Sequence, residues 1–199
     1  MNGFKAFNRW STEEIEVKDE GLKRYICLRP KIVPRTGARY AGQKFHKSNV
    51  FIVERLMNKL MVPGHRGKKH KITSGHCTGK ALTSYKTTER CLEIIEKKTG
   101  KNPIEVLVKA IENAATREEI VTIEYGGARY PKAVECSPQR RVDLALRYFV
   151  QGAYDKSFRS KLSIEEALAE EILLAYENNP KSLAISKKKE LERQADASR

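Results

Sequence analysis

Basic charge is concentrated in one part of this 199-residue chain. Residues 21–90 carry 17 Lys and Arg side chains against two acidic ones, a net charge of +15, whereas the whole chain has +14. No Asp or Glu stands between Gly21 and Val50. Like charges repel one another when a chain becomes compact, so this block needs an anionic partner. The sequence therefore predicts a protein that binds a polyanion such as nucleic acid.

The most basic stretch, residues 23–47, reads KRYICLRPKIVPRTGARYAGQKFHK, and its Pro and Gly residues exclude a regular helix. An extended, basic segment with aromatic rings can follow a phosphate backbone while its rings stack on unpaired bases. The alternatives are a solvated, partly disordered arm and, less well supported, a membrane-surface segment. We expect an N-terminal arm over residues 1–47, extended and basic from about residue 21. Its candidate RNA-binding residues are Arg35, Arg39, Lys44 and Lys47.

Helical periodicity and capping signals dominate the rest of the chain, residues 48–199. Six helices are expected, and together they make the protein mainly α. They begin at Ser48 or Asn49, Thr78, Asn102-Pro103, Ser137-Pro138, Ser163 with Glu166, and about Ser182. Pro63-Gly64 ends the first of these helices and Gly100 ends the second.

The periodicity changes to two over residues 119–136, where apolar and polar side chains alternate on either side of Gly126-Gly127. This pattern predicts a β-hairpin. Because an isolated two-stranded ribbon is marginally stable in water, we expect it to project from the helical body and to gain order from what it touches.

Other classes of protein find little support. No window approaches the roughly 18 consecutive apolar residues of a membrane span, and the N-terminal segment lacks the apolar run of a signal peptide. The cysteines, at positions 27, 77, 91 and 136, form no C-x-x-C pair. They fit reduced thiols in a cytosol.

Residues 65–81 contain the two patterns closest to a cofactor site. GHCTGKA, residues 75–81, resembles a phosphate-binding loop, but its spacing is one residue short and Ala81 replaces the hydroxyl that would hold magnesium. His65, His70, His76 and Cys77 could ligate zinc, although their spacing matches no usual ligand set and five cations surround them. We therefore predict no metal, no cofactor and, in the absence of any catalytic motif, no catalytic residue. The loop cations Lys68, Lys69 and Lys71 are candidates for RNA binding.

Further cations stand where they could contact a phosphate backbone. Arg129 and Lys132 lie on the hairpin, Arg140 and Arg141 lie in the first turn of a helix, and Lys187, Lys188 and Lys189 form a run near the C-terminus. The hairpin cations and the lysine run could instead have purely structural roles. Charged residues protect hairpin edges from aggregation, and the lysine run could pair with Glu190 and Glu192 at helical spacing.

Several long motifs together resemble the universal small-subunit ribosomal protein S seven family, in its archaeal and eukaryotic branch. They are FNRWS (7–11), ERLMNKLM and GKK (within 54–69), GKNPIEVLVKAIENAATRE (100–118), YGGARYPKAVECSPQRRVDLAL (125–146) and SLAISKKKELERQADASR (182–199). The resemblance implies a six-helix bundle with one protruding β-hairpin, which agrees with the periodicity. It also implies a non-enzymatic protein of the small ribosomal subunit in the cytoplasm, with neither membrane attachment nor homo-oligomerisation.

The resemblance further implies specific partners. Such a protein binds the 3′ major domain of small-subunit rRNA, nucleates assembly of the head, and contacts other head and platform proteins. The hairpin tip at Gly126, Gly127 and Arg129 is expected near the exit-site tRNA and the mRNA path. Arg140, Arg141, Lys68, Lys69 and Lys187–Lys189 are expected on rRNA. Two alternatives remain open: an enzyme that processes or modifies RNA with the same basic surface, and a zinc-dependent regulator.

Overall fold

The computed structural model describes residues 4–66, 69–70 and 78–199, and these are mainly helical. Six helices have nine or more residues, and α1 (Glu20–Lys23) is a single turn. The six are α2 (Ile52–Leu60), α4 (Ala81–Thr99), α5 (Pro103–Ala114), α6 (Pro138–Ser157), α7 (Ile164–Tyr176) and α8 (Leu183–Asp196). The predicted mainly α fold with six principal helices is confirmed.

Local signals fix several helix ends where they were predicted. Asn102 Oδ1 accepts a hydrogen bond from the Ile104 N–H at 3.1 Å, with Pro103 in the first helical position. Ser163 and Glu166 form the reciprocal capping box of α7. Gly100 ends α4 in the left-handed conformation, at φ 65°.

Two helices begin later than predicted. α2 begins at Ile52 because the residues before it form a separate 3₁₀ turn, η2 (His46–Asn49). α4 begins at Ala81, after Lys80, and neither helix has a side-chain cap at its first turn. A polar residue near the start of a helix thus does not cap that helix when the residue lies in a separate turn before the first helical residue.

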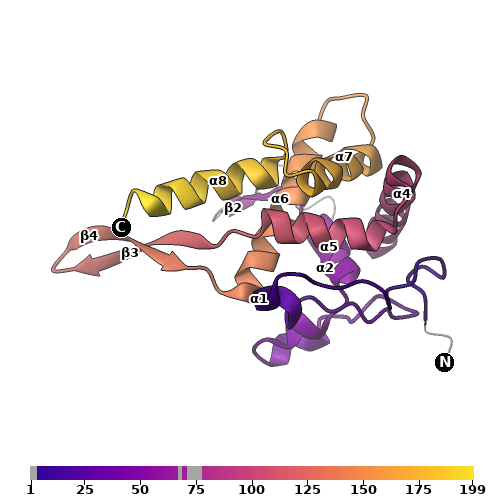
Figure 1. Cartoon of the computed structure of the whole chain (residues 1–199), viewed down its shortest axis with the longest axis horizontal. Helices are drawn as coiled ribbons and strands as arrows, with labels where there is room; N and C mark the ends of the chain where they lie inside the picture. Colours follow the sequence, from indigo (N-terminus) through magenta and orange to yellow (C-terminus); the bar gives the residue numbers. More distant parts are fainter. Residues whose placement is uncertain (1–3, 67–68, 71–77) are drawn as a thin grey trace.

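Helix α7 packs against α4, α5 and α6 (Figure 1). Its Leu168 and Ile172 are fully buried with Phe149 of α6 and Leu107 of α5. Each such side chain contributes about 1.5–3 kcal/mol relative to an exposed one. This core is the rigid support of the surfaces described below.

A buried carboxylate joins α6, α7 and α8. Glu171 is fully buried, and its Oε1 accepts hydrogen bonds from Ser182 Oγ at 2.7 Å and from the Ala184 N–H at 3.3 Å. It thereby caps α8 from another helix. Lys156 Nζ lies 3.2 Å from Glu171 Oε2 and supplies the counter-charge.

The N-terminal segment divides into two stretches. Up to Ile26 it packs on the bundle, with Trp10 and Leu22 in the core, and Glu112 Oε1 accepts the Lys18 and Asp19 N–H groups at 2.6 and 3.1 Å. Residues 29–46 are mostly exposed and contain η1 (Arg39–Gly42). The domain boundary at residue 47 stays a prediction.

The hairpin consists of β3 (Glu118–Tyr125) and β4 (Ala128–Glu135), antiparallel from Glu118 opposite Glu135 to Tyr125 opposite Ala128. Gly126 and Gly127, at φ 58° and 83°, make the turn. The prediction of residues 119–136 is confirmed to within one residue at each end. The hairpin projects from the helical body (Figure 1).

Helix α8 lies along the base of the hairpin and packs on β3 (Figure 1). Glu192 Oε1 accepts the Arg117 N–H at 3.1 Å, and Arg199 forms an ion pair with Glu118. A second antiparallel pair, β1 (His65–Arg66) with β2 (Lys69–His70), was not predicted, since two-residue strands show no alternation.

Candidate nucleic-acid interface

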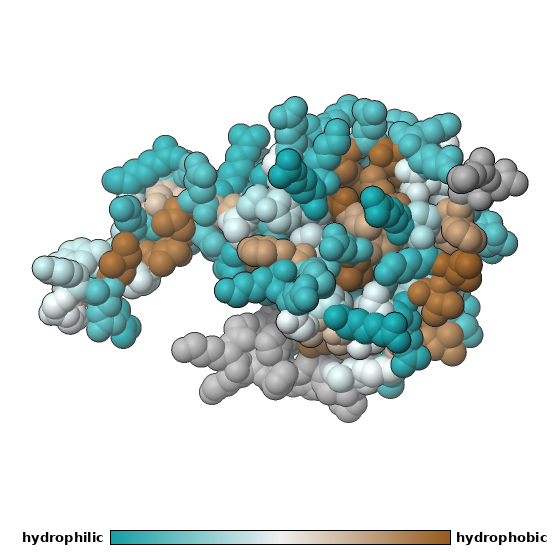
Figure 2. All heavy atoms as spheres, turned by 90° about the horizontal axis from the view of Figure 1, so that it is seen from below, coloured by the Kyte–Doolittle hydropathy of each residue, from teal (hydrophilic) through white to brown (hydrophobic). Residues whose placement is uncertain are grey.

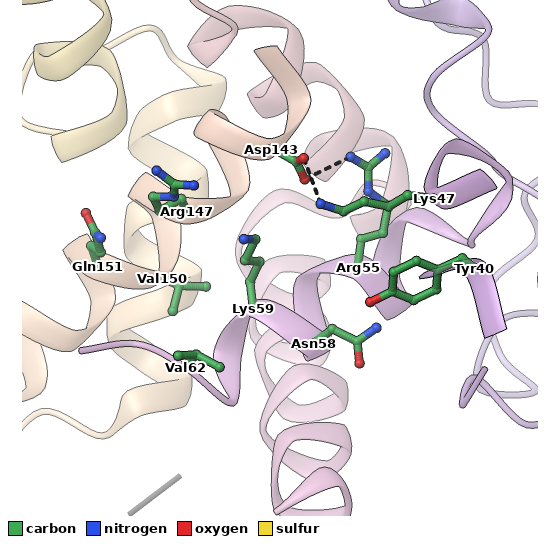
Figure 3. A pocket seen from close by; sticks show the side chains of 10 residues that line it. All are labelled: Tyr40, Lys47, Arg55, Asn58, Lys59, Val62, Asp143, Arg147, Val150 and Gln151. Atoms are coloured by element: carbon green, nitrogen blue, oxygen red, sulfur yellow. Dashed lines mark hydrogen bonds and ion pairs between the residues drawn. The ribbon is translucent and has the colours of Figure 1, made fainter. Parts of the chain in front are cut away.

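A cleft of about 230 Å³ opens between η1, α2 and α6 (Figure 3). Four of the five charged side chains around it are cationic. It is lined by Tyr40, Lys47, Arg55, Asn58, Lys59, Val62, Asp143, Arg147, Val150 and Gln151. Four cations and one carboxylate therefore face a common space.

Helical spacing explains how these charges come together. Arg55 and Lys59 are four residues apart on α2, and Asp143 and Arg147 are four residues apart on α6. Residues at this spacing lie on one face of a helix. Because α2 packs against α6, the two charged rows meet.

Asp143 holds two of the cations in place. Lys47 Nζ donates to its Oδ2 at 2.7 Å, and Arg55 Nη2 donates to its Oδ1 at 3.2 Å. Burial alone would raise the pKa of this carboxyl, but Lys47 and Arg55 outweigh burial and lower the pKa below its ordinary value. Arg55 Nη1 also donates to the Tyr25 carbonyl at 2.9 Å, so the guanidinium is fixed.

Lys59 and Arg147 form no ion pair with any residue that the structure describes. Burial lowers the pKa of the Lys59 amine, and the nearby charges of Lys47, Arg147 and Arg55 lower it further, against the opposing effect of Asp143. The negative charge of an anion bound at this amine would offset the repulsion from the neighbouring cations and stabilise the charged form of the amine. The charge balance of the cleft therefore favours an anion over a cation.

Neighbouring hollows extend this site in both directions. One of about 630 Å³ shares Tyr40 and is lined by Lys31, Arg35, Arg39 and His46. Another of about 220 Å³ shares Asp143 and Arg147 and includes Arg140 at the start of α6. We call the whole surface the basic face, defined by Lys31, Arg35, Arg39, Lys47, Arg55, Lys59, Arg140 and Arg147.

A buried contact fixes the exposed end of the basic face. Glu54 on α2 is 1% exposed, and its Oε1 accepts both the Thr36 N–H and the Thr36 hydroxyl, each at 2.7 Å. Thr36 lies between the predicted residues Arg35 and Arg39. This loop is thus attached to the body, although most of its side chains are exposed.

The structure brings some of the predicted RNA-binding residues into this face and leaves others elsewhere. Arg35, Arg39, Lys47 and Arg140 line it, and Lys44 is exposed between η1 and η2. Lys69 lies in strand β2. Lys68 and Lys71 lie outside the described residues, as do His76 and Cys77 of the proposed zinc ligands.

Several of the remaining predicted cations are paired within the chain. Arg140 Nε donates to Glu119 at 2.8 Å, Arg141 Nη2 donates to Asp19 at 2.9 Å, and Arg129 Nε lies 3.5 Å from Glu124.

The lysine run near the C-terminus is partly paired as well. Lys187 forms an ion pair with Glu190 at 2.6 Å, as expected if the run pairs with glutamates at helical spacing. Lys188 donates to the Asn113 carbonyl at 2.8 Å, and burial lowers its pKa. Lys132 and Lys189 are exposed.

Arg55, Lys59, Asp143 and Arg147 were not among the predicted site residues. The signal that could have found them is the i, i+4 repeat of charge along each of two amphipathic helices. Reading it as a site requires knowing that the two helices meet, and periodicity alone does not show that.

The cysteines that the structure describes include two with raised thiol pKa values. Cys91 is fully buried, and burial raises its thiol pKa. Burial also raises the pKa of Cys136, to about 11. Among residues 4–66, 69–70 and 78–199, no group of three His, Cys, Asp or Glu side chains could hold a metal ion. Nor does any helix in these ranges have the length and apolar character needed to cross a membrane.

The hairpin carries apolar side chains far from the core. Val121, Ile123 and Tyr130 are 44%, 46% and 58% exposed, and Ile123 pairs with Tyr130 across the strands. Figure 2 shows hydrophobic patches along this projection as well as on the helical body. A ribbon with such side chains is suited to contact a partner.

Comparisons with known proteins agree with the geometry. The family model described as Ribosomal protein S7p/S5e matches residues 22–199. The chain is 56% identical over 195 residues to the small ribosomal subunit protein uS7 of Nanoarchaeum equitans, which covers 98% of both chains. It is 47% identical over 194 residues to that of Archaeoglobus fulgidus, which covers 98% of this chain and 94% of the relative. On both grounds, the chain belongs to the ribosomal protein S7p/S5e family.

Proposed function

We propose that the chain binds small-subunit rRNA through the basic face and that this binding anchors it in the head of the subunit. The observation that carries the proposal is the row of three adjoining hollows in which cations outnumber carboxylates. Such a row can neutralise successive phosphates along a folded strand.

The family fixes the coarser part of the function. The chain is a structural ribosomal protein of the small subunit, acts in translation on the cytoplasmic ribosome, and has rRNA and other ribosomal proteins as partners. The family is not enzymatic, which removes the alternative of an enzyme that processes RNA.

The finer assignment is part of the proposal. The rRNA target is the 3′ major domain, and binding there nucleates head assembly, with head and platform proteins as neighbours and no homo-oligomer. The cations that the proposal places on rRNA include Lys44, Arg141 and Lys187–Lys189, besides the basic face and the loop residues Lys68, Lys69 and Lys71. To bind a phosphate, Arg141 would release Asp19 and Lys188 would release the Asn113 carbonyl.

The hairpin has a separate role in the proposal. Because it projects away from the basic face, its tip can reach a second RNA while the body stays on rRNA. We assign Gly126, Gly127 and Arg129 to contacts near the exit-site tRNA and the mRNA path, with Lys132 further along the same strand. The two glycines let the tip approach a nucleic-acid backbone closely.

Salt dependence of rRNA binding tests the electrostatic premise. If the chain neutralises about ten phosphates, raising salt from about 50 to 200 mM should weaken binding to a 3′ major domain transcript by roughly 10³ to 10⁵. The double variant Lys59→Gln/Arg147→Gln should bind more weakly and with a shallower salt slope. A matched double variant on α4, Lys97→Gln/Lys98→Gln, should keep the wild-type slope. A flat salt response, or equal losses in both variants, would contradict the proposal.

Chemical footprinting tests the target. Protection confined to the 3′ major domain, and lost in the Lys59→Gln/Arg147→Gln variant, is the expected result. Protection elsewhere on the small-subunit rRNA would refute the assignment.

A further inference from the structure

We infer that the cleft between η1, α2 and α6 binds one unpaired nucleotide of RNA, with its phosphate at Lys59 and Arg147 and its base beside Tyr40 and Asn58. This inference rests on the proposed function, and it adds a nucleotide-sized subsite within the basic face. A surface that only neutralises a phosphate backbone needs no more than cations. The cleft also has an aromatic ring, Tyr40, and a side-chain amide, Asn58.

The phosphate end of the cleft is defined by charge. Figure 3 shows the Lys59 amine pointing between Asp143 and Arg147. Asp143 already accepts hydrogen bonds from Lys47 and Arg55, so these two cations are fixed. Lys59 and Arg147 form no ion pair within the described part of the chain and remain as donors for a phosphate.

The rest of the cleft is suited to a base. Figure 3 places the Tyr40 ring beside Arg55 and Asn58, while Val62 and Val150 lie on the other side of Lys59. An aromatic ring such as that of Tyr40 can contact the face of an unstacked base. The Asn58 amide has both a donor and an acceptor, so it can hydrogen-bond to a base edge.

The size of the cleft excludes a helix or a folded peptide and leaves room for no more than one nucleotide. Its volume of about 230 Å³ is below the roughly 300–1,000 Å³ of pockets that enclose a drug-sized ligand. Base-specific RNA recognition mostly uses unpaired bases that can leave the stack. The hydrogen bonds of Arg55 and Lys47 keep this part of the cleft wall in place before the nucleotide binds.

Titration of the full chain with small probes tests this inference. Chemical shifts would be followed in isotope-labelled protein with each of the four nucleoside monophosphates, with ribose 5-phosphate and with inorganic phosphate. We expect at least one nucleotide to bind several-fold more tightly than ribose 5-phosphate and to shift the Asn58 side-chain amide. The Asn58→Ala and Tyr40→Ala variants should reduce that preference while leaving ribose 5-phosphate binding within about twofold.

Charge variants separate the two ends of the site. Lys59→Met/Arg147→Met should abolish binding of every probe, whereas the matched Lys97→Met/Lys98→Met variant should bind as wild type. Equal binding of phosphate and nucleotides, or shifts outside the cleft only, would overturn the nucleotide assignment. So would preferential binding of an acidic peptide included as a further probe.

The same variants distinguish this inference from the proposed function. If Tyr40→Ala and Asn58→Ala leave nucleotide binding unchanged while the wild type shows salt-dependent rRNA binding, the nucleotide subsite is refuted and the rRNA interface stands. If the wild type fails to bind the 3′ major domain transcript, the proposed function falls whatever the small probes do.

Discussion

Lys156 and Lys59 are both partly buried lysines that project from helices of the same body, yet their surroundings are opposite. Lys156 lies 3.2 Å from Glu171 and 3.5 Å from Glu170, at the junction of α6, α7 and α8. Lys59 is surrounded mainly by Lys47, Arg55 and Arg147, and burial lowers its pKa. The first lysine completes an internal network, whereas the second leaves positive charge uncompensated.

This difference separates stability from binding. A buried carboxylate is costly unless a cation and hydrogen bonds accompany it, so Lys156 belongs to the fold. A partly buried cation among other cations adds nothing to the stability of the free chain and becomes favourable when an anion arrives. The same side chain therefore has opposite consequences when it is removed from the two places.

The largest expected effect is on stability, from Lys156→Met. The substitution leaves the fully buried Glu171 carboxylate without its nearest counter-charge, and the free energy of unfolding should fall by about 3 kcal/mol. Urea denaturation measures it. The exposed control Lys98→Met should change stability by less than about 0.5 kcal/mol. Equal effects in the two variants would erase the distinction between the two lysines.

Gly152→Ala probes the same junction from a position one helical turn before Lys156 on α6. A Cβ on Gly152 would lie 2.8 Å from Glu171 Cδ, and moving that carboxylate would break its bonds to Ser182 and Ala184. We expect a loss of about 1–3 kcal/mol, although Ala is otherwise the better helix former.

The control for Gly152→Ala is Gly42→Ala, where an added Cβ meets nothing within 4 Å. Its unfolding free energy should stay within about 0.5 kcal/mol of wild type. A Gly152→Ala variant as stable as wild type would show that the Glu171 cap tolerates displacement.

Lys59→Met tests the opposite kind of lysine. Its stability should equal or slightly exceed that of wild type, because a desolvated, repelled charge is removed. Binding to the 3′ major domain transcript should weaken roughly tenfold, the equivalent of one hydrogen bond to a charged group at about 1.5 kcal/mol. The salt slope should also decrease by about one. Loss of stability without loss of binding would show that Lys59, like Lys156, stabilises the fold and does not bind RNA.

The smallest expected effect concerns acid stability, through Asp143. Lys47 and Arg55 outweigh burial and lower the pKa of this carboxyl in the folded state. A lowered folded pKa contributes stability that is present above the unfolded value of about 3.9 and is lost as pH falls through the folded pKa. Denaturation curves at successive pH values below 5 should show this loss in wild type and a smaller one in Asp143→Asn. Identical acid profiles would refute the role of Asp143 as the internal counter-ion.

Sequence alone predicts the elements whose signals are local. The Asn102-Pro103 start, the Ser163-Glu166 capping box, the Gly100 stop and the Gly126-Gly127 turn each depend on a few neighbouring residues, and the structure has each of them in place. The predicted start of α2 is too early, because Ser48 and Asn49 belong to η2 and do not cap the helix.

The candidate site is less predictable because it depends on which helices meet. Lys47 and Asp143 are 96 residues apart in the chain, and Arg55 and Asp143 are 88 apart. Nothing in either local sequence indicates that one carboxylate serves both cations. In the same way, Arg141 and Lys188 were predicted to face RNA, and only the packing shows their contacts with Asp19 and Asn113.

The attachment of the hairpin to α8 has a mechanical consequence. Eight residues per strand at about 3.3 Å each give a lever of roughly 26 Å. A tilt of about 10° at its base would swing the tip by roughly 4–5 Å. Since Glu192 and Arg199 contact Arg117 and Glu118 at that base, the end of α8 and the residues after it set the direction in which the ribbon leaves the body.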